Sequence, residues 1–167
     1  MSVYSFEVRP ESIARAFSVY VVVAVRQRPE FLYVGKTGDN RAGCNPIISR
    51  CGNHFSYFRV HSQIRNKIAD HEKYSYRYFF VHFDRYREDR SNRNAIDRIN
   101  EMERWLNQKI QTVLDGTDIE HLNPYKGRNP SAKTRAAART FRKPENERKV
   151  DELVAEAVSF VQSFNSN

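Results

Sequence analysis

Two apolar runs separated by a short proline-containing turn constrain the fold of this chain more than any other feature. The first run, from Ser18 to Val25, is continuous and rich in valine, which is typical of a strand buried on both faces. The second run, Phe31 to Val34, follows a turn over residues 27–30 and stops at Gly35. Two strands so close in sequence predict an antiparallel hairpin.

The remaining patterns predict one further strand and several helices. A third strand is expected over residues 76–83, after a helix that starts at Asn45-Pro46 and carries apolar residues at 47, 48, 51, 55 and 58. Helical periodicity also covers residues 91–114 and, as an amphipathic stripe, 150–164, and a short helix is expected within 10–16. These elements predict an α+β fold: a small three-stranded, mostly antiparallel sheet flanked by helices, with a C-terminal helical appendage.

The expected organisation has four parts. Residues 1–16 form an N-terminal extension, 17–125 a central domain, 126–149 a basic linker and 150–167 a C-terminal amphipathic helix. The apolar stripe of that last helix must be buried, either by docking back on the domain or by pairing with a second copy in a homodimer.

The charge of the chain favours a polyanionic partner. Its 28 Lys and Arg exceed its 20 Asp and Glu, which gives a net charge of +8 and a pI near 9.7, and phosphate contacts release condensed counterions. The linker is strongly basic, although such a run can also be a solvated stretch of charge. The residues expected to contact DNA phosphates are Lys126, Arg128, Lys133, Arg135, Arg139 and Arg142.

The length of the apolar runs and the number of cysteines argue against a membrane-spanning protein and a disulfide-rich one. The longest apolar run, Val19 to Val25, is far too short to span a bilayer, and no secretory signal is apparent. The two cysteines are too few for a disulfide framework, and their spacing to His54 and His61 matches no common zinc site. We therefore expect a cytoplasmic protein with no membrane partner.

One carboxylate stands out. Glu103 falls inside the apolar stripe of the predicted 91–114 helix, where an unpartnered charge would be costly. Such a residue is either a glutamate at the edge of the core, paired with an arginine such as Arg98 or Arg104, or a metal-binding or catalytic group.

The hairpin and the next helix add further candidates. Tyr20 lies in the first strand and Tyr33 in the second, where each alone could be an ordinary core aromatic. Arg50 and His54 lie four residues apart on the following helix, so both side chains can reach the sheet from one flank.

Taken in order, these segments resemble the motifs of the GIY-YIG nuclease family. The resemblance covers about residues 17–125. Its motifs here are Val19-Tyr20, Phe31-Leu-Tyr-Val-Gly-Lys-Thr37, Asn45 to Phe55 with Arg50 and His54, Met102-Glu-Arg-Trp-Leu106, and His121-Leu-Asn-Pro-Tyr125. The chain departs from the pattern at Ser18, which stands where the family has its first glycine.

The resemblance implies roles for these residues. Tyr20 would be the general base, with Lys36 as its helper, and Arg50 would stabilise the transition state, unless Arg41 in the preceding loop takes that part. Glu103 would bind one Mg²⁺ or Mn²⁺, and Tyr33 and His54 would position phosphate or water. Asn123 is a further candidate.

The resemblance thus implies a metal-dependent DNA endonuclease that hydrolyses phosphodiester bonds by a one-metal mechanism. The alternative is a non-catalytic DNA- or RNA-binding module on the same scaffold. Cleavage specificity, biological role and the choice between DNA and RNA do not follow from the sequence.

Overall fold

The computed structural model describes residues 3–38, 44–89, 91–126 and 132–164, with side chains from 136 onward in the last range. The elements in chain order are α1 (Pro10–Ile13), β1 (Ala16–Val25), β2 (Pro29–Lys36), α2 (Ile47–Phe55), the 3₁₀ turn η1 (His71–Lys73), β3 (Ser75–Arg85), α3 (Arg93–Leu114), β4 (Glu120–His121), α4 (Ala132–Arg139) and α5 (Pro144–Gln162).

The sheet has the order β3-β1-β2-β4. The strands β1 and β2 form the predicted antiparallel hairpin, and β3 pairs antiparallel with the other edge of β1. The α+β class is confirmed, but the prediction of three strands is wrong, because β4 adds a parallel pair to β2 through Phe31–Glu120 and Leu32–His121. A two-residue strand has no periodicity of its own, so its pattern could not be recognised in the sequence.

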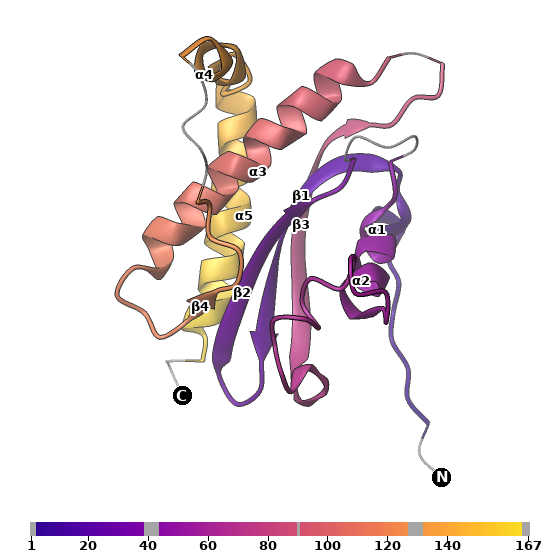
Figure 1. Ribbon diagram of the computed structural model, residues 1–167, viewed down its shortest axis with the longest axis vertical. Coiled ribbons are helices and arrows are strands. Elements are labelled where there is room, and N and C mark those ends of the chain that lie inside the picture. The colour runs from indigo at the N-terminus through magenta and orange to yellow at the C-terminus, as the bar shows by residue number, and fades with distance from the viewer. Residues whose placement is uncertain (1–2, 39–43, 90, 127–131, 165–167) are drawn as a thin grey trace.

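Helices cover both faces of the sheet. Figure 1 shows α3 and α5 on one side and α1 and α2 on the other. Successive side chains of β1 alternate between these layers, so that Val19, Val21 and Val23 pack with α3 and α5, whereas Tyr20 and its alternate neighbours face α2. Nine of the ten β1 residues are buried, which explains why the run is continuous rather than alternating.

The C-terminal region is more helical than expected. The segment predicted to be a linker contains α4, and α5 begins at Pro144 rather than at Val150. Val150, Leu153 and Ala157 are buried in the same core as α3. The apolar stripe of α5 is therefore covered within one chain and does not require a second copy.

A smaller difference concerns the end of α2. The helix α2 ends at Phe55, so Phe58 lies beyond it on the surface instead of continuing the apolar stripe. Within the described ranges no helix is long and apolar enough to cross a membrane.

Candidate active site

Side chains from four elements meet in one pocket of about 170 Å³, which we call the polar pocket. All six residues predicted to act in catalysis line it, from β1, β2, α2 and α3. The full lining is Tyr20, Tyr33, Lys36, Arg50, Asn53, His54, His61, Gln63 and Glu103. The hairpin register and the packing of α2 and α3 on opposite faces thus bring together residues that are up to 83 positions apart, from Tyr20 to Glu103.

The first strand and α2 fix the centre of the pocket. Tyr20 is buried, and its hydroxyl oxygen lies 2.8 Å from Nε2 of His54. Gly35 is the cross-strand partner of Tyr20, and a Cβ there would overlap Cζ and Oη of the phenol and lie 2.8 Å from its Cε2. Only glycine therefore leaves room for the Tyr20 ring in this position.

The aromatic rings around Tyr20 form a close cluster. The centroid of Tyr33 lies 4.9 Å from that of His54 and 6.3 Å from that of Tyr20, and Tyr78 of β3 lies 6.2 Å from Tyr20. The ring planes of Tyr33 and His54 are inclined by 72°, an edge-to-face contact. This packing restricts the directions in which the hydroxyl of Tyr20 and the imidazole can point.

Burial sets the protonation of these groups. It lowers the pKa of His54 to about 4, with a further contribution from the Arg50 charge. Burial, followed by the neighbouring Tyr33 and opposed by Arg50, raises the pKa of Tyr20 well above its usual range, and burial together with the charge of Glu103 raises the pKa of Tyr33 to about 12. At neutral pH the imidazole and both phenols are uncharged.

The side chain of Glu103 lines the polar pocket and is not buried in the core. Its carboxylate forms an ion pair with Lys36, and its side chain keeps 28% exposure. The ammonium of Lys36 is bound to Glu103, and the help that Lys36 was predicted to give Tyr20 stays a prediction. Because the pair joins β2 to α3, it holds the carboxylate at the edge of the sheet.

The fully buried carboxylate of α3 is Glu101, which we did not predict. Its side chain is 2% exposed and pairs with Arg104 at 2.8 Å and with Nε of Arg142 at 2.9 Å. A buried carboxylate requires such partners. The Arg142 guanidinium also lies 5.0 Å from the Trp105 ring, so Arg142 has internal partners, and the DNA contact predicted for it stays a prediction.

The donor set of the polar pocket fits a weakly held, hydrated divalent ion. Glu103 is the one carboxylate among its nine lining residues, and the described part of the chain contains no group of three or more His, Cys, Asp or Glu that could enclose a metal. Mg²⁺ is commonly bound through one or two carboxylates, with waters and substrate oxygens completing its shell. The predicted Mg²⁺ or Mn²⁺ on Glu103 stays a prediction.

Asn123, the further candidate, has a well-defined structural position, and its part in the site stays a prediction. Its amide makes two hydrogen bonds to the backbone of Val34, accepting from the N–H at 3.0 Å and donating to the carbonyl at 2.7 Å. Its own carbonyl accepts from Nδ2 of Asn107 at 2.9 Å. Asn123 therefore continues the pairing of β2 beyond β4 and ties this edge to α3.

The other predicted phosphate contacts are only partly described. Lys126 and Arg139 are exposed, and Lys126 lines a second groove of about 460 Å³ that shares Glu103 with the polar pocket. Arg41 and Arg128, and the side chains of Lys133 and Arg135, lie outside the described residues.

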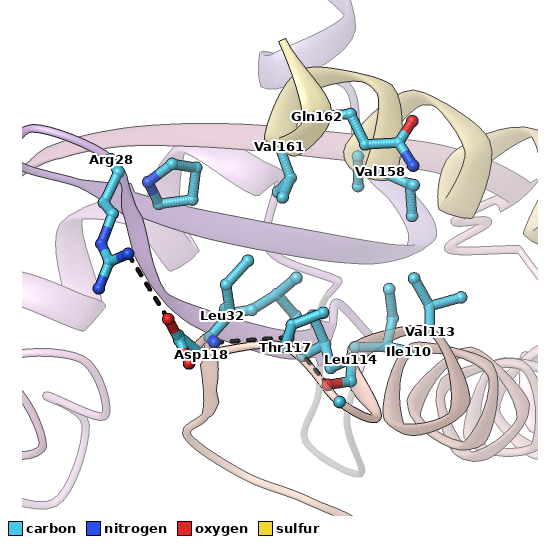
Figure 2. Close-up of a pocket in the computed structure, with 14 residues that line it drawn as sticks. Arg28, Leu32, Ile110, Val113, Leu114, Thr117, Asp118, Val158, Val161 and Gln162 are labelled. Atoms are coloured by element: carbon cyan, nitrogen blue, oxygen red, sulfur yellow. Dashed lines mark hydrogen bonds and ion pairs between the residues drawn. The ribbon is translucent and has the colours of Figure 1, made fainter. Parts of the chain in front are cut away.

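A larger pocket of about 400 Å³ lies between α3, α5 and the start of β2, and most of its lining residues are apolar (Figure 2). Leu32, Ile110 and Val161 point into it, and an ion pair between Arg28 and Asp118 at 3.5 Å stands at one end. It shares no lining residue with the polar pocket. Its walls offer little chemistry, so we do not place the reaction there.

Four members of the site were not found from the sequence. Asn53, His61 and Gln63 line the polar pocket, and Tyr78 completes the aromatic cluster. Asn53 lies on the same helix as Arg50 and His54, but neither His61 nor Gln63 belongs to a periodic segment that would have indicated its direction.

Comparison with protein-family models finds no match to this chain, and searches of curated proteins and of solved structures find none either.

Proposed function

We propose that this protein is a metal-dependent DNA endonuclease that hydrolyses phosphodiester bonds in the polar pocket. The observation that carries the proposal is the meeting of Tyr20, Arg50, His54 and Glu103, from separate elements, around one small open pocket. Two cations, Lys36 and Arg50, and one carboxylate line it, a balance that suits an anionic phosphate.

Arg50 would bind the scissile phosphate. A guanidinium offers a planar set of donors that matches two phosphate oxygens at once, and its charge counters the charge that develops in the transition state. The same cation contributes to keeping His54 neutral, because it opposes a second positive charge nearby.

Tyr20 and His54 would act as a proton relay. The raised pKa of Tyr20 disfavours a resting phenolate, so the hydroxyl would take the proton of the attacking water while passing its own to Nε2 of His54, 2.8 Å away. This transfer requires the neutral tautomer with its proton on Nδ1. Its low pKa leaves His54 able to accept at neutral pH, although it makes the imidazole a weak base.

Glu103 would hold the divalent ion, which when bound supplies positive charge at the phosphate. Lys36 would keep the Glu103 carboxylate at the mouth of the pocket and share it with the ion. Tyr33, whose ring contacts His54, would orient the imidazole.

The second candidate function is DNA or RNA binding without cleavage. It is favoured by the ion pair between Lys36 and Glu103, which engages the proposed metal ligand with a lysine. Both functions predict nucleic-acid binding, so only cleavage that depends on a divalent ion distinguishes them.

Plasmid cleavage provides the test. The purified protein should convert supercoiled plasmid to nicked or linear forms with Mg²⁺ or Mn²⁺ and not with excess chelator. Glu103→Gln should remove this activity, whereas Glu120→Gln, an exposed carboxylate on β4, should retain it. Metal-independent cutting, or equal activity of the two variants, would contradict the proposed function.

A further inference from the structure

A short loop beside the polar pocket presents aromatic side chains to solvent. Residues 57–63, here called the aromatic loop, follow α2 directly. The exposed fractions of Tyr57, Phe58 and Val60 are 83%, 77% and 79%. Three neighbouring apolar side chains on the surface are unusual and often mark a binding site.

The backbone of the aromatic loop is held in place from within. The buried Ser62 hydroxyl donates to the carbonyl of Phe58 at 2.8 Å, and Nδ2 of Asn66 donates to the carbonyl of Arg59 at 2.6 Å. Ile64, just beyond the loop, is buried in the core under α2. The exposed rings are therefore carried on an ordered support, which lowers the entropic cost of using them in binding.

The aromatic loop is continuous with the polar pocket. His61 and Gln63 of the loop line that pocket, and the amide of Arg65 donates to the carbonyl of His54 at 3.1 Å. A substrate whose phosphate lies in the polar pocket would thus have its adjoining nucleotides near Tyr57 and Phe58.

The loop combines aromatic surface with positive charge. The guanidinium of Arg65 lies 4.6 Å from the centroid of the Tyr57 ring, and Arg59 is exposed between Phe58 and Val60. Stacking platforms flanked by cations are the general means of holding single strands, because every base has a face that can stack. In an intact duplex the base faces are covered by their neighbours, and such rings would find little to contact.

From these contacts we infer that the aromatic loop binds unpaired bases next to the cleaved phosphate, so that the substrate is DNA with a single-stranded or splayed segment. This inference rests on the proposed function, since the polar pocket fixes where the phosphate lies. Tyr57 and Phe58 stack with the bases, and Arg59 and Arg65 approach the adjoining phosphates.

Binding measured in chelator tests the inference independently of cleavage. The probes are a fluorescent single strand, a fork with two unpaired arms, and a duplex of the same sequence, each titrated with the full chain. The double variant Tyr57→Ala/Phe58→Ala should bind the single strand and the fork about 5- to 100-fold more weakly, as expected for lost base stacking, and the duplex almost unchanged. The control is Tyr4→Ala/Phe6→Ala, which removes the same ring types from positions 90% and 84% exposed and should bind all three probes as wild type does.

A second readout reports the stacking itself. 2-Aminopurine placed in the unpaired arm of the fork should lose fluorescence on binding wild type and the control, and much less on binding Tyr57→Ala/Phe58→Ala. Equal weakening on duplex and single strand would show that the loop contacts DNA without selecting unpaired bases, and no weakening would show that it does not contact DNA; either result would overturn the inference. If wild type stacks the probe but never cuts DNA in Mg²⁺, the proposed function fails, and of the inference only the binding of unpaired bases by the aromatic loop stands. If wild type cuts DNA while the variant binds the fork normally, the inference alone fails.

Discussion

Replacing Gly35 by alanine should disable the site while leaving most of the fold intact. The new methyl group would overlap Cζ and Oη of Tyr20 and stand 2.8 Å from Cε2. Since carbon atoms in contact lie about 3.5–4.0 Å apart, the phenol must move by roughly 1 Å. Such overpacking costs about 1–3 kcal/mol of stability, and a misplacement of about 1 Å at reacting groups can reduce a rate by about 100-fold.

The assay compares single-turnover cleavage and thermal unfolding of Gly35→Ala with those of Gly52→Ala. Nothing lies within 4 Å of a Cβ at Gly52, which is in α2, so that variant should cleave normally and gain about 0.5–1 kcal/mol from the lower flexibility of the unfolded chain. In the background Tyr20→Ala, the change Gly35→Ala should cost little stability, because the overlapping ring is gone. Normal cleavage by Gly35→Ala, or the same loss of stability in both backgrounds, would refute this account of the Gly35 contact.

Three further predictions concern other contacts. Arg50→Lys should cleave about 100-fold or more slowly, because a point charge does not replace the bidentate guanidinium; near-normal single-turnover rates would count against its role at the phosphate. Stability should fall as the pH drops from 6.5 towards 4, because His54 takes up a proton in the unfolded chain but not in the folded protein, where burial lowers its pKa to about 4. Melting curves at several pH values should show a smaller fall for His54→Gln than for wild type. An equal fall in both proteins would contradict this prediction. Glu101→Ala should destabilise the fold by about 1.5–3 kcal/mol in urea titrations, because Arg104 and Arg142 lose the buried carboxylate that they share. Glu103→Ala should cost less than about 1 kcal/mol, because its pair with Lys36 is partly exposed.

The sequence predicted best what depends on local periodicity. The run from Ser18 to Val25 indicated a strand buried on both faces, and the helical stripe around Ile99 and Leu106 indicated a helix against the core. Burial of alternate or i+3/i+4 side chains leaves a strong pattern in sequence. The two-residue β4, and the contact of Asn123 with Val34, leave no such pattern because they depend on chain segments meeting from far apart.

The members of the polar pocket could be nominated from motif order, but their pairings could not. Glu101 and Glu103 are two residues apart on one helix. Glu101 is the buried one because the segment that follows α4 brings Arg142 against it. Likewise, the partner of Lys36 depends on where α3 crosses the edge of β2. Tertiary packing decides which side chains pair, and the spacing of residues in the sequence does not reveal that packing.

The proposed function requires that the Tyr20 hydroxyl takes part in the chemistry of the polar pocket. The most direct measurement is the single-turnover rate of DNA cleavage in Mg²⁺ by Tyr20→Phe and by the matched variant Tyr78→Phe, which removes a buried hydroxyl from the same aromatic cluster but not from the pocket lining. We expect a loss of about 100- to 10,000-fold for Tyr20→Phe, the usual contribution of a positioned general base, and a rate close to wild type for Tyr78→Phe. Wild-type cleavage by Tyr20→Phe, or equal losses in both variants, would contradict the claim.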